Sequence, residues 1–160
     1  QVYVQDSASK GKYRFLVSYP ILGASGVLGP KLREGDRQVP EGLYIIESLE
    51  PNTPYHLGLR LNYPCNRDWQ RAKEDEREHP GSDILIHGKD CSIGCLAMGD
   101  QTAEDLFVLA YDAKDHHWPV VLSPVDLRRQ APPPAKPEDP SWLPALYEDI
   151  RVSLAEYPLD

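Results

Sequence analysis

The sequence predicts a mainly β domain with flanking helices, in which a curved mixed sheet or a sandwich is followed by a C-terminal helix. Short runs of alternating apolar and polar residues occupy much of the first 90 positions, and clusters of turn residues separate them. Helical periodicity is confined to a few segments. With 160 residues, 41% of them apolar, the chain is long enough to bury the core of one domain.

Two hairpins are expected in the first half of the chain. Residues 2–5 and 13–18 alternate around the turn-like sequence Ser9-Lys10-Gly11, which is typical of a β-hairpin. Residues 43–49 and 56–63 are also rich in strand-forming side chains. Two prolines and an asparagine lie between them at residues 50–54, so we expect both strands to end at this turn.

Between the hairpins, residues 23–42 contain five glycines, two prolines and a mixture of charges. A connection of this length without helix or strand is uncommon unless it has a function, so we expect an ordered surface loop that lines a site. Its cations, Lys31, Arg33 and Arg37, could contact a substrate carboxylate, although loop charges most often serve only solvation.

Three helices are predicted. Residues 68–78 are strongly charged, with Asp68 as the expected cap and Pro80 beyond the end. Residues 102–114 have the strongest pattern, with Thr102 and Asp105 in capping-box spacing. The core-facing stripe of this second helix is Leu106, Leu109, Ala110 and Ala113. Residues 142–157 form a third amphipathic segment.

Short apolar strands are expected at residues 83–87 and 119–123. The proline-rich residues 129–140 read as a polyproline-like spacer that lets the terminal helix pack back. We therefore predict one domain over residues 1–128, a spacer over 129–140 and a terminal helix over 141–160, without internal repeats.

Charge and hydropathy exclude several classes of partner. A net charge of −8 argues against nucleic acid and anionic membrane surfaces, which require clustered Lys and Arg. No stretch approaches the length needed to cross a bilayer, so membrane insertion is not expected. The first residues lack the basic and apolar regions of a signal peptide, so they do not indicate a compartment.

The chemistry is expected in residues 84–100, where a histidine, a serine and two cysteines follow an apolar run. A histidine at the end of a strand and a cysteine in a glycine-containing turn can act as base and nucleophile in acyl transfer. A free thiol has a pKa of about 8.5 and only its thiolate is strongly nucleophilic, so a neighbouring imidazole is needed near neutral pH. The other histidines, His56, His79, His116 and His117, are expected to be non-catalytic.

Several fragments in one order resemble a known family. They are Gly29-Pro-Lys, Glu34-Gly35-Asp36, Pro40-Glu41-Gly42-Xaa-Tyr44, Asn62-Tyr63-Pro64, Ile86-His87-Gly88, Ser92-Ile-Gly94-Cys95 and Pro124-Val-Asp-Leu-Arg128. Together they resemble the L,D-transpeptidase catalytic domain, also called the YkuD domain, and especially its short-motif branch of murein peptide-processing proteins. The resemblance covers roughly residues 1–128 and, more loosely, the terminal helix.

The resemblance implies a role for each residue of the motif. Cys95 matches the nucleophile that forms a thioester with a peptidoglycan stem peptide, and His87 matches its base. The N–H groups of Gly94 and Cys95 are expected to face the developing oxyanion. Gly88 would offer a carbonyl to orient the imidazole, and Ser92 would form a hydrogen bond that shapes the turn, with substrate contact as the lesser alternative. No cofactor is implied.

Two departures from the common motif concern substrate choice. Ile93 stands where a histidine is usual, and Leu96-Ala-Met follows the cysteine where an arginine is usual, so donor recognition is expected to differ. The short spacing from His87 to Cys95 resembles the spacing in the branch that includes peptidoglycan peptide hydrolases. Hydrolysis is therefore an alternative to cross-linking, and a wall-linked protein is an alternative partner. Aromatic residues that could line a substrate groove, or else belong to the core, are Tyr55, Tyr63 and Trp69.

The cysteines allow a competing interpretation. His87, Cys91 and Cys95 stand at four-residue steps and, with Cys65, could form a structural zinc site. We favour no metal, and a Cys65–Cys91 disulfide that leaves Cys95 free, as expected in the oxidising bacterial periplasm or cell envelope. Two unpaired buried thiols, and an inactive peptidoglycan-binding module, are the remaining alternatives.

Overall fold

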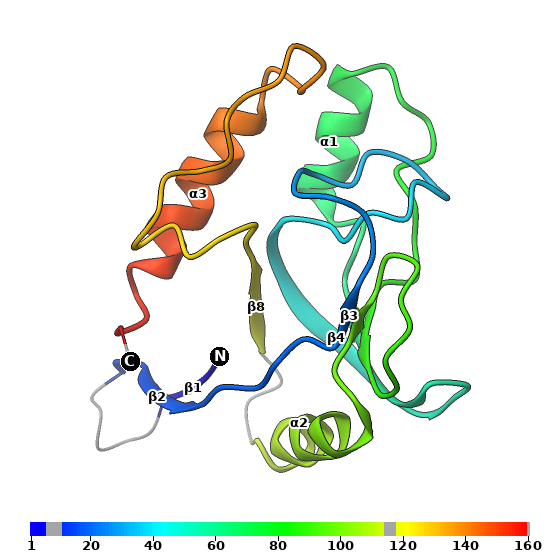
Figure 1. Ribbon diagram of the computed structural model, residues 1–160, viewed down its shortest axis with the longest axis vertical. Helices are drawn as coiled ribbons and strands as arrows, with labels where there is room; N and C mark the ends of the chain where they lie inside the picture. Colours follow the sequence, from blue (N-terminus) through cyan, green and yellow to red (C-terminus); the bar gives the residue numbers. More distant parts are fainter. Residues whose placement is uncertain (6–10, 114–117, 160) are drawn as a thin grey trace.

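A six-stranded mixed sheet in the order β3-β7-β6-β5-β4-β8 organises the described part of the chain (Figure 1). This computed structural model describes residues 1–5, 11–113 and 118–159. The β6–β7 pair is parallel and the other neighbouring pairs are antiparallel, as a curved mixed sheet requires. The strands are β3 (Gly23–Ala24), β4 (Gly42–Thr53), β5 (His56–Leu61), β6 (Leu85–His87), β7 (Leu96–Ala97) and β8 (Pro119–Leu122). The predicted fold class is confirmed.

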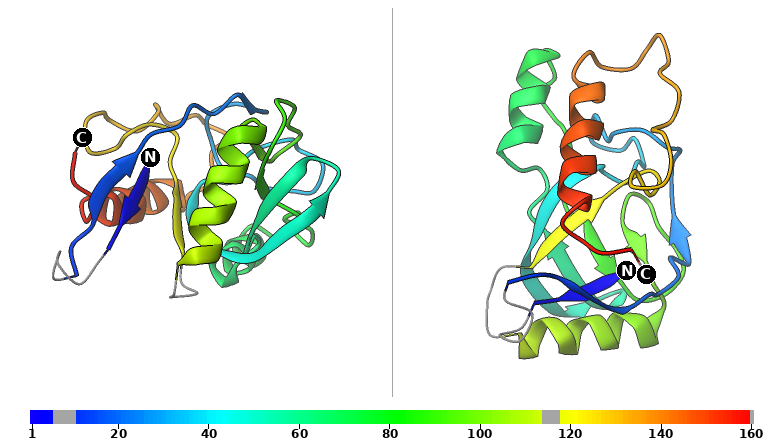
Figure 2. Two further views of the ribbon diagram at one scale, coloured as in Figure 1. Left: turned by 90° about the horizontal axis from the view of Figure 1, so that it is seen from below. Right: turned by 90° about the vertical axis from the view of Figure 1, so that its left-hand side faces the viewer.

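The first predicted hairpin forms a separate two-stranded sheet. Strands β1 (Val2–Val4) and β2 (Arg14–Val17) pair antiparallel, with Val2 opposite Val17. Most of the predicted turn lies outside the described residues. Arg128 ties this hairpin to the end of the chain, because its guanidinium donates to the Tyr3 hydroxyl at 3.2 Å and to the Tyr157 carbonyl at 3.0 Å. The two ends of the chain consequently lie close together (Figure 2).

The second hairpin is also present, but its first strand does not end at the prolines. Strand β4 continues through Pro51 to Thr53, and its register with β5 shifts between Glu50 and Thr53. Among the described residues, strand β8 pairs with the Gly42–Ile45 part of β4 and no strand pairs with Pro51 on that side, so Pro51 lies on an edge of the described sheet. A proline removes no ladder hydrogen bond at a free edge, which explains why the strand tolerates it.

Helix α1 spans Asn66–Glu74 and starts before the predicted residue 68. Cys65 is its N-cap, and the Asp68 carboxylate reaches back to accept the Cys65 N–H at 2.8 Å. Asp68 is therefore the third residue of the first turn and not the cap, so the expected boundary was wrong. The side chain performs the stabilising role of a capping-box acid at that position.

Helix α2 spans Asp100–Asp112 and begins after Gly99, two residues before the predicted Thr102 cap. Gly99 has φ +80°, a conformation that favours glycine. The buried side chains of the helix are Ala103 and Ala110. In contrast to the predicted stripe, Leu109 is 38% exposed. His116 and His117 lie outside the described residues.

Two hydrophobic clusters occupy opposite faces of the sheet. The first contains Tyr44 and Leu59, and helix α2 contributes Ala110 to it. The second lies under helix α3 (Leu143–Leu154) and packs against Leu43 of β4. Side chains alternate along a strand, so those of the neighbouring residues Leu43 and Tyr44 point to opposite faces of the sheet. The two clusters therefore lie on opposite faces. No helix in the described ranges is both long and apolar enough to span a membrane.

Candidate active site

His87 ends strand β6 with its side chain only 1% exposed. Its Nδ1 lies 2.5 Å from the carbonyl oxygen of Gly88. A carbonyl can only accept, so Nδ1 carries the ring proton and Nε2 is left with a free lone pair. The ring also stacks on Tyr55, with centroids 4.7 Å apart and planes inclined by 30°. The expected orientation of the imidazole by the Gly88 carbonyl is present in the structure.

Close packing explains the glycine at position 88. A Cβ atom there would lie 2.6 Å from Asp100 Oδ1 and 2.8 Å from the carbonyl oxygen of Tyr55. Asp100, the first residue of α2, accepts the Lys89 N–H at 2.8 Å. The start of α2 and the β4–β5 turn therefore both pack against Gly88, which leaves no space for a side chain at this position.

Cys95 immediately precedes β7, the parallel neighbour of β6. The pairs Ile86–Leu96 and His87–Ala97 set the register, so Cys95 lies beside Leu85. Residues 85 and 87 of β6 and residues 95 and 97 of the neighbouring segment point to one face, because side chains alternate. Cys95, at the entrance to β7, and His87, at the end of β6, thus belong to neighbouring segments of the sheet.

The Cys95 thiol is hydrogen-bonded to the main chain of the segment that leads into β6. Cys95 Sγ accepts the Leu85 N–H at 3.4 Å and donates to the Asp83 carbonyl at 3.5 Å, and no hydrogen bond joins it to His87 in the described structure. Burial raises the pKa of the Cys95 thiol, while the Leu85 N–H acts in the opposite direction. A raised pKa favours the protonated thiol near neutral pH.

Ser92 shapes the turn that presents Cys95. Its hydroxyl donates to the Cys95 carbonyl at 2.5 Å and accepts the Gly94 N–H at 3.2 Å. Gly94 has φ +126°, which favours glycine. Of the two expected oxyanion donors, the Gly94 N–H is already engaged by Ser92, whereas the Cys95 N–H has no acceptor among the described residues. The local hydrogen bond expected of Ser92 is present.

The loop before β4 lies against this turn. Ser25 Oγ is 3.3 Å from Ser92 Oγ, and the carbonyl oxygen of Gln38 would be 3.4 Å from a Cβ atom at Gly94. Within the loop, Lys31 is 9% exposed and its Nζ lies 2.6 Å from Asp36 Oδ1. The expectation that this segment lines a site agrees with these contacts, but Lys31 is already paired with a carboxylate.

The other candidate substrate contacts divide into exposed and buried residues. Ile93 is 73% exposed beside Cys95, and Arg33 is also at the surface. Tyr63 is only 6% exposed and donates its hydroxyl to the Pro80 carbonyl at 2.7 Å. Tyr63 is therefore a core residue, and a substrate contact by this side chain was a wrong expectation. Trp69 is 50% exposed on α1.

The three cysteines are free thiols in the structure. Cys65 packs against the first hydrophobic cluster at the start of α1, whereas Cys91 is exposed in the connection between β6 and β7. The expected Cys65–Cys91 disulfide is therefore absent. The described ranges also contain no group of three or more His, Cys, Asp or Glu side chains that could hold a metal ion.

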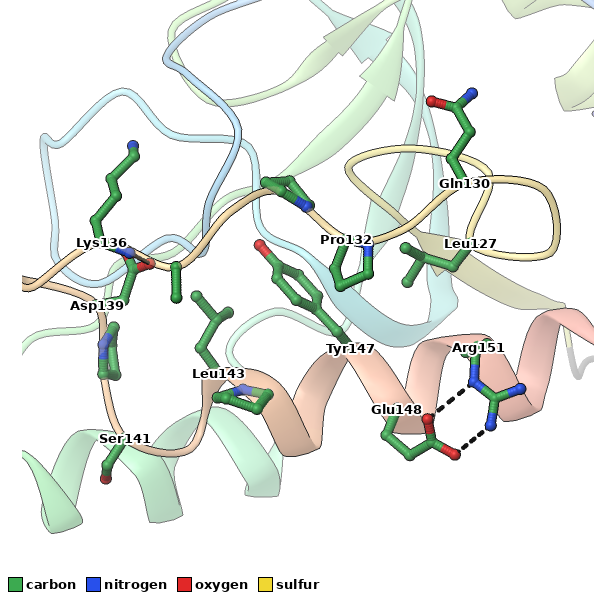
Figure 3. A pocket seen from close by; sticks show the side chains of 14 residues that line it. Leu127, Gln130, Pro132, Lys136, Asp139, Ser141, Leu143, Tyr147, Glu148 and Arg151 are labelled. Atoms are coloured by element: carbon green, nitrogen blue, oxygen red, sulfur yellow. Dashed lines mark hydrogen bonds and ion pairs between the residues drawn. The ribbon is translucent and has the colours of Figure 1, made fainter.

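A cavity of about 490 Å³ lies elsewhere, between the proline-rich segment and α3 (Figure 3). Leu143 and Tyr147 of α3 line it, with the ion-paired Glu148 and Arg151 at its side. Neither His87 nor Cys95 contributes to its lining. The cavity is therefore separate from the candidate chemistry.

Sequence patterns did not reveal two neighbours of the site. The stacking of Tyr55 on His87 depends on the tight β4–β5 turn, although Tyr55 was a candidate aromatic. The Asp83 carbonyl beside the thiol depends on a left-handed backbone at Asp83, with φ +55°.

The sequence was compared with models of known protein families and with curated proteins. The sequence model of the L,D-transpeptidase catalytic domain (YkuD) matches residues 2–140. The chain belongs to the L,D-transpeptidase (YkuD) family, which confirms the resemblance found in the motifs.

Two curated relatives share this family. Over 98 residues the chain is 36% identical to the protein named "Putative L,D-transpeptidase YafK" from Escherichia coli K12, and equally identical to the protein of the same name from Escherichia coli O157:H7. The match covers 60% of this chain and 37% of each relative. The chain thus spans well under half the length of these relatives.

Proposed function

We propose that this chain is a cysteine acyl transferase that acts on peptidoglycan stem peptides through a thioester on Cys95. The observation that carries the proposal is the His87–Gly88 hydrogen bond of 2.5 Å, which engages Nδ1 with a carbonyl and leaves Nε2 for another partner, on the strand next to the segment that carries Cys95. An imidazole held in this tautomer is suited to removing a proton from a thiol. Family membership supports the same chemistry.

The reaction begins from a protonated thiol, because burial raises the pKa of Cys95. Rotation about the Cα–Cβ bond of Cys95 moves the thiol away from the Asp83 carbonyl and toward His87, which takes the proton. The thiolate attacks the carbonyl carbon of the donor peptide, and the Cys95 N–H donates to the oxyanion that develops. The leaving amine then takes the proton from His87, and the thioester remains.

The second half of the reaction decides the product. An amine of a second stem peptide would resolve the thioester into a new cross-link, whereas water would resolve it into a free carboxylic acid on the donor peptide. A protein linked to the donor through its amine would already have left when the thioester formed. The short spacing between His87 and Cys95 favours keeping the hydrolase as a second candidate. A peptidoglycan substrate would place the protein in the bacterial periplasm or cell envelope.

Product analysis tests the proposal. The purified protein is incubated with tetrapeptide-bearing and protein-linked muropeptides, with and without an amine acceptor, and the products are read by mass spectrometry. Cys95→Ala and His87→Ala are the test variants, and Cys91→Ala is the matched control because Cys91 is an exposed cysteine of the same turn region.

Each outcome has a distinct meaning. Cross-linked dimers that require Cys95 would establish a transpeptidase, and products of water addition alone would establish the hydrolase. Turnover that survives Cys95→Ala would refute the proposal, as would the absence of any Cys95-dependent product in either arm.

A further inference from the structure

A bridging cation lies on the same face of the sheet as the candidate site. Arg60 of β5 places its Nε 3.0 Å from Glu50 Oε1 and forms a second ion pair with the Asp83 carboxylate. Glu50 is itself held by the Ser48 hydroxyl, which donates to Oε1 at 2.8 Å. The guanidinium thus connects β4 to the residue that precedes β6.

The Asp83 end of this bridge reaches the thiol. The main-chain carbonyl of Asp83 accepts the Cys95 thiol proton at 3.5 Å. Asp83 has φ +55°, a left-handed conformation that costs free energy for a residue other than glycine and persists where neighbours hold it. Its side chain is 76% exposed, so the ion pair with Arg60 matters for position more than for stability.

Arg60 and Cys95 are also connected through Leu85 of β6. Arg60 pairs with Leu85 across β5 and β6, and the Leu85 N–H donates to Cys95 Sγ at 3.4 Å. Arg60 and Cys95 therefore flank the same residue of the central strand. This connection runs through the main chain and does not depend on the Asp83 side chain.

We infer that Arg60 is a positioning residue for Cys95: by pairing with the Asp83 carboxylate, it offsets the negative charge beside the thiol and places a positive charge there that favours the thiolate over the thiol held by the Asp83 carbonyl. This inference deepens the proposed function, on which its consequence for turnover rests.

The charges around the Cys95 thiol support this role of Arg60. Lys31 and Arg60 lower the pKa of Cys95, Asp83 raises it, and burial outweighs them all. Lys31 comes from the loop before β4 and is committed to Asp36 at 2.6 Å, while His87 is the titratable group on β6. Arg60 is thus the cation that both acts on the thiol and neutralises the nearby Asp83.

The test measures the thiol directly. Alkylation of Cys95 by iodoacetamide is followed from pH 6 to 10 by peptide mass spectrometry, with the exposed Cys91 as reference in the same molecule. In Arg60→Gln the midpoint for Cys95 should rise by roughly half to one pH unit, and the rate below the midpoint should fall about threefold to tenfold. Arg60→Lys should restore part of the shift.

Two further variants separate charge from general structure. Arg60→Gln combined with Asp83→Asn removes both charges and should return the midpoint to within about 0.3 pH units of the unaltered protein. Arg67→Gln is the matched control, since Arg67 forms an exposed ion pair with Asp149 at 3.3 Å on other elements, and it should leave the midpoint unchanged.

The outcomes are distinguishable from those of the proposed function. An unchanged midpoint in Arg60→Gln, or a double variant that behaves like Arg60→Gln, would overturn the inference. If Arg60→Gln does not fold, Asp83→Asn alone must lower the Cys95 midpoint, and failure to do so overturns it equally. A midpoint shift in a protein that forms no muropeptide product would leave the inference standing and refute only the proposed function.

Turnover gives a readout that a merely structural residue would not move. For an active protein, kcat/KM of Arg60→Gln should fall near neutral pH and converge with that of the unaltered protein at high pH, where the thiol ionises in both. An equal loss at every pH would show that Arg60 acts through the fold and would contradict the inference.

Discussion

The Nδ1 atom of His87 lies 2.5 Å from the carbonyl oxygen of Gly88, the residue that follows it in the chain. This hydrogen bond fixes the tautomer of a nearly fully buried imidazole without a carboxylate partner. One main-chain carbonyl therefore orients the imidazole of the candidate site, and residues that hold this carbonyl should influence activity.

Gly88→Ala is expected to disturb that carbonyl. The new Cβ atom would lie 2.6 Å from Asp100 Oδ1 and 2.8 Å from the Tyr55 carbonyl oxygen, so the chain must shift. Overpacking of this kind costs about 1–3 kcal/mol, and we expect kcat/KM to fall by at least about tenfold. Urea unfolding and muropeptide turnover check this.

Gly35→Ala provides the comparison, because Gly35 has a positive φ of +73° but open space around it. It should lose about 1 kcal/mol of stability through backbone strain and retain activity. Full activity in Gly88→Ala would show that the carbonyl does not orient His87.

Tyr55 is expected to matter through its ring. Its centroid lies 4.7 Å from that of His87, and aromatic stacking contributes about 0.5–1.5 kcal/mol. Tyr55→Ala should therefore lower kcat/KM by roughly twofold to tenfold, while Tyr55→Phe, which keeps the ring, should remain near the original value. Equal losses in the two variants would implicate the hydroxyl group instead of the stacking.

Ser92→Ala should loosen the turn that carries the nucleophile. It removes the hydrogen bond to the Cys95 carbonyl at 2.5 Å and that from the Gly94 N–H at 3.2 Å. We expect a loss of about 1–2 kcal/mol in the free energy of unfolding and about tenfold or more in kcat/KM.

Ser25→Ala is the control for this variant, since it removes the 3.3 Å contact with Ser92 and the hydrogen bond of Ser25 to the Arg37 carbonyl at 2.7 Å but leaves both turn hydrogen bonds of Ser92. Its kcat/KM should stay within about threefold of the original. If Ser25→Ala is as impaired as Ser92→Ala, the loop contact and not the turn governs activity.

Asp36→Asn should destabilise the loop before β4. Burial alone would raise the pKa of Asp36, but the Lys31 ammonium and the N–H groups of Arg33, Gln38 and Leu32 outweigh it, so the pKa is lowered. Removing the charge leaves Lys31 buried without its partner, for which we expect a loss of about 3–5 kcal/mol. Chemical unfolding at neutral pH measures this.

The sign of the pH dependence follows from the lowered pKa of Asp36. Its contribution to stability is present above the unfolded pKa of about 3.9 and is lost as the pH falls through the lower folded value. The difference in unfolding free energy between the original protein and Asp36→Asn should therefore shrink in acid. Asp149→Asn, which breaks an exposed pair, should change stability by less than about 1 kcal/mol at any pH.

Local patterns predicted the elements of the fold better than their boundaries. Alternation of side chains located both hairpins, and helical periodicity located α3. Tertiary contacts moved the ends: a free sheet edge lets β4 pass through Pro51, and Gly99 caps α2 before Thr102. Such contacts join residues that are distant in the chain, so a local pattern does not contain them.

In the candidate site, too, local sequence patterns predicted some features and tertiary contacts determined the others. The motif identified His87, Cys95 and the turn serine, because their spacing is local. The sequence did not reveal that Asp83 adopts φ +55° or that its carbonyl meets the thiol, since both depend on the packing of β6 against its neighbours. The wrong expectations for Tyr63 and the disulfide also came from residues whose burial is set by tertiary structure.

Trapping of the acyl intermediate tests the central claim most directly. The protein is mixed with a tetrapeptide muropeptide without an acceptor, quenched in acid, and analysed by intact-mass and peptide mass spectrometry. The account predicts an added acyl group on the peptide that contains Cys95, which hydroxylamine removes and which is absent from Cys95→Ala. Donor consumption that continues in Cys95→Ala, or an acyl group on a different residue, would contradict it.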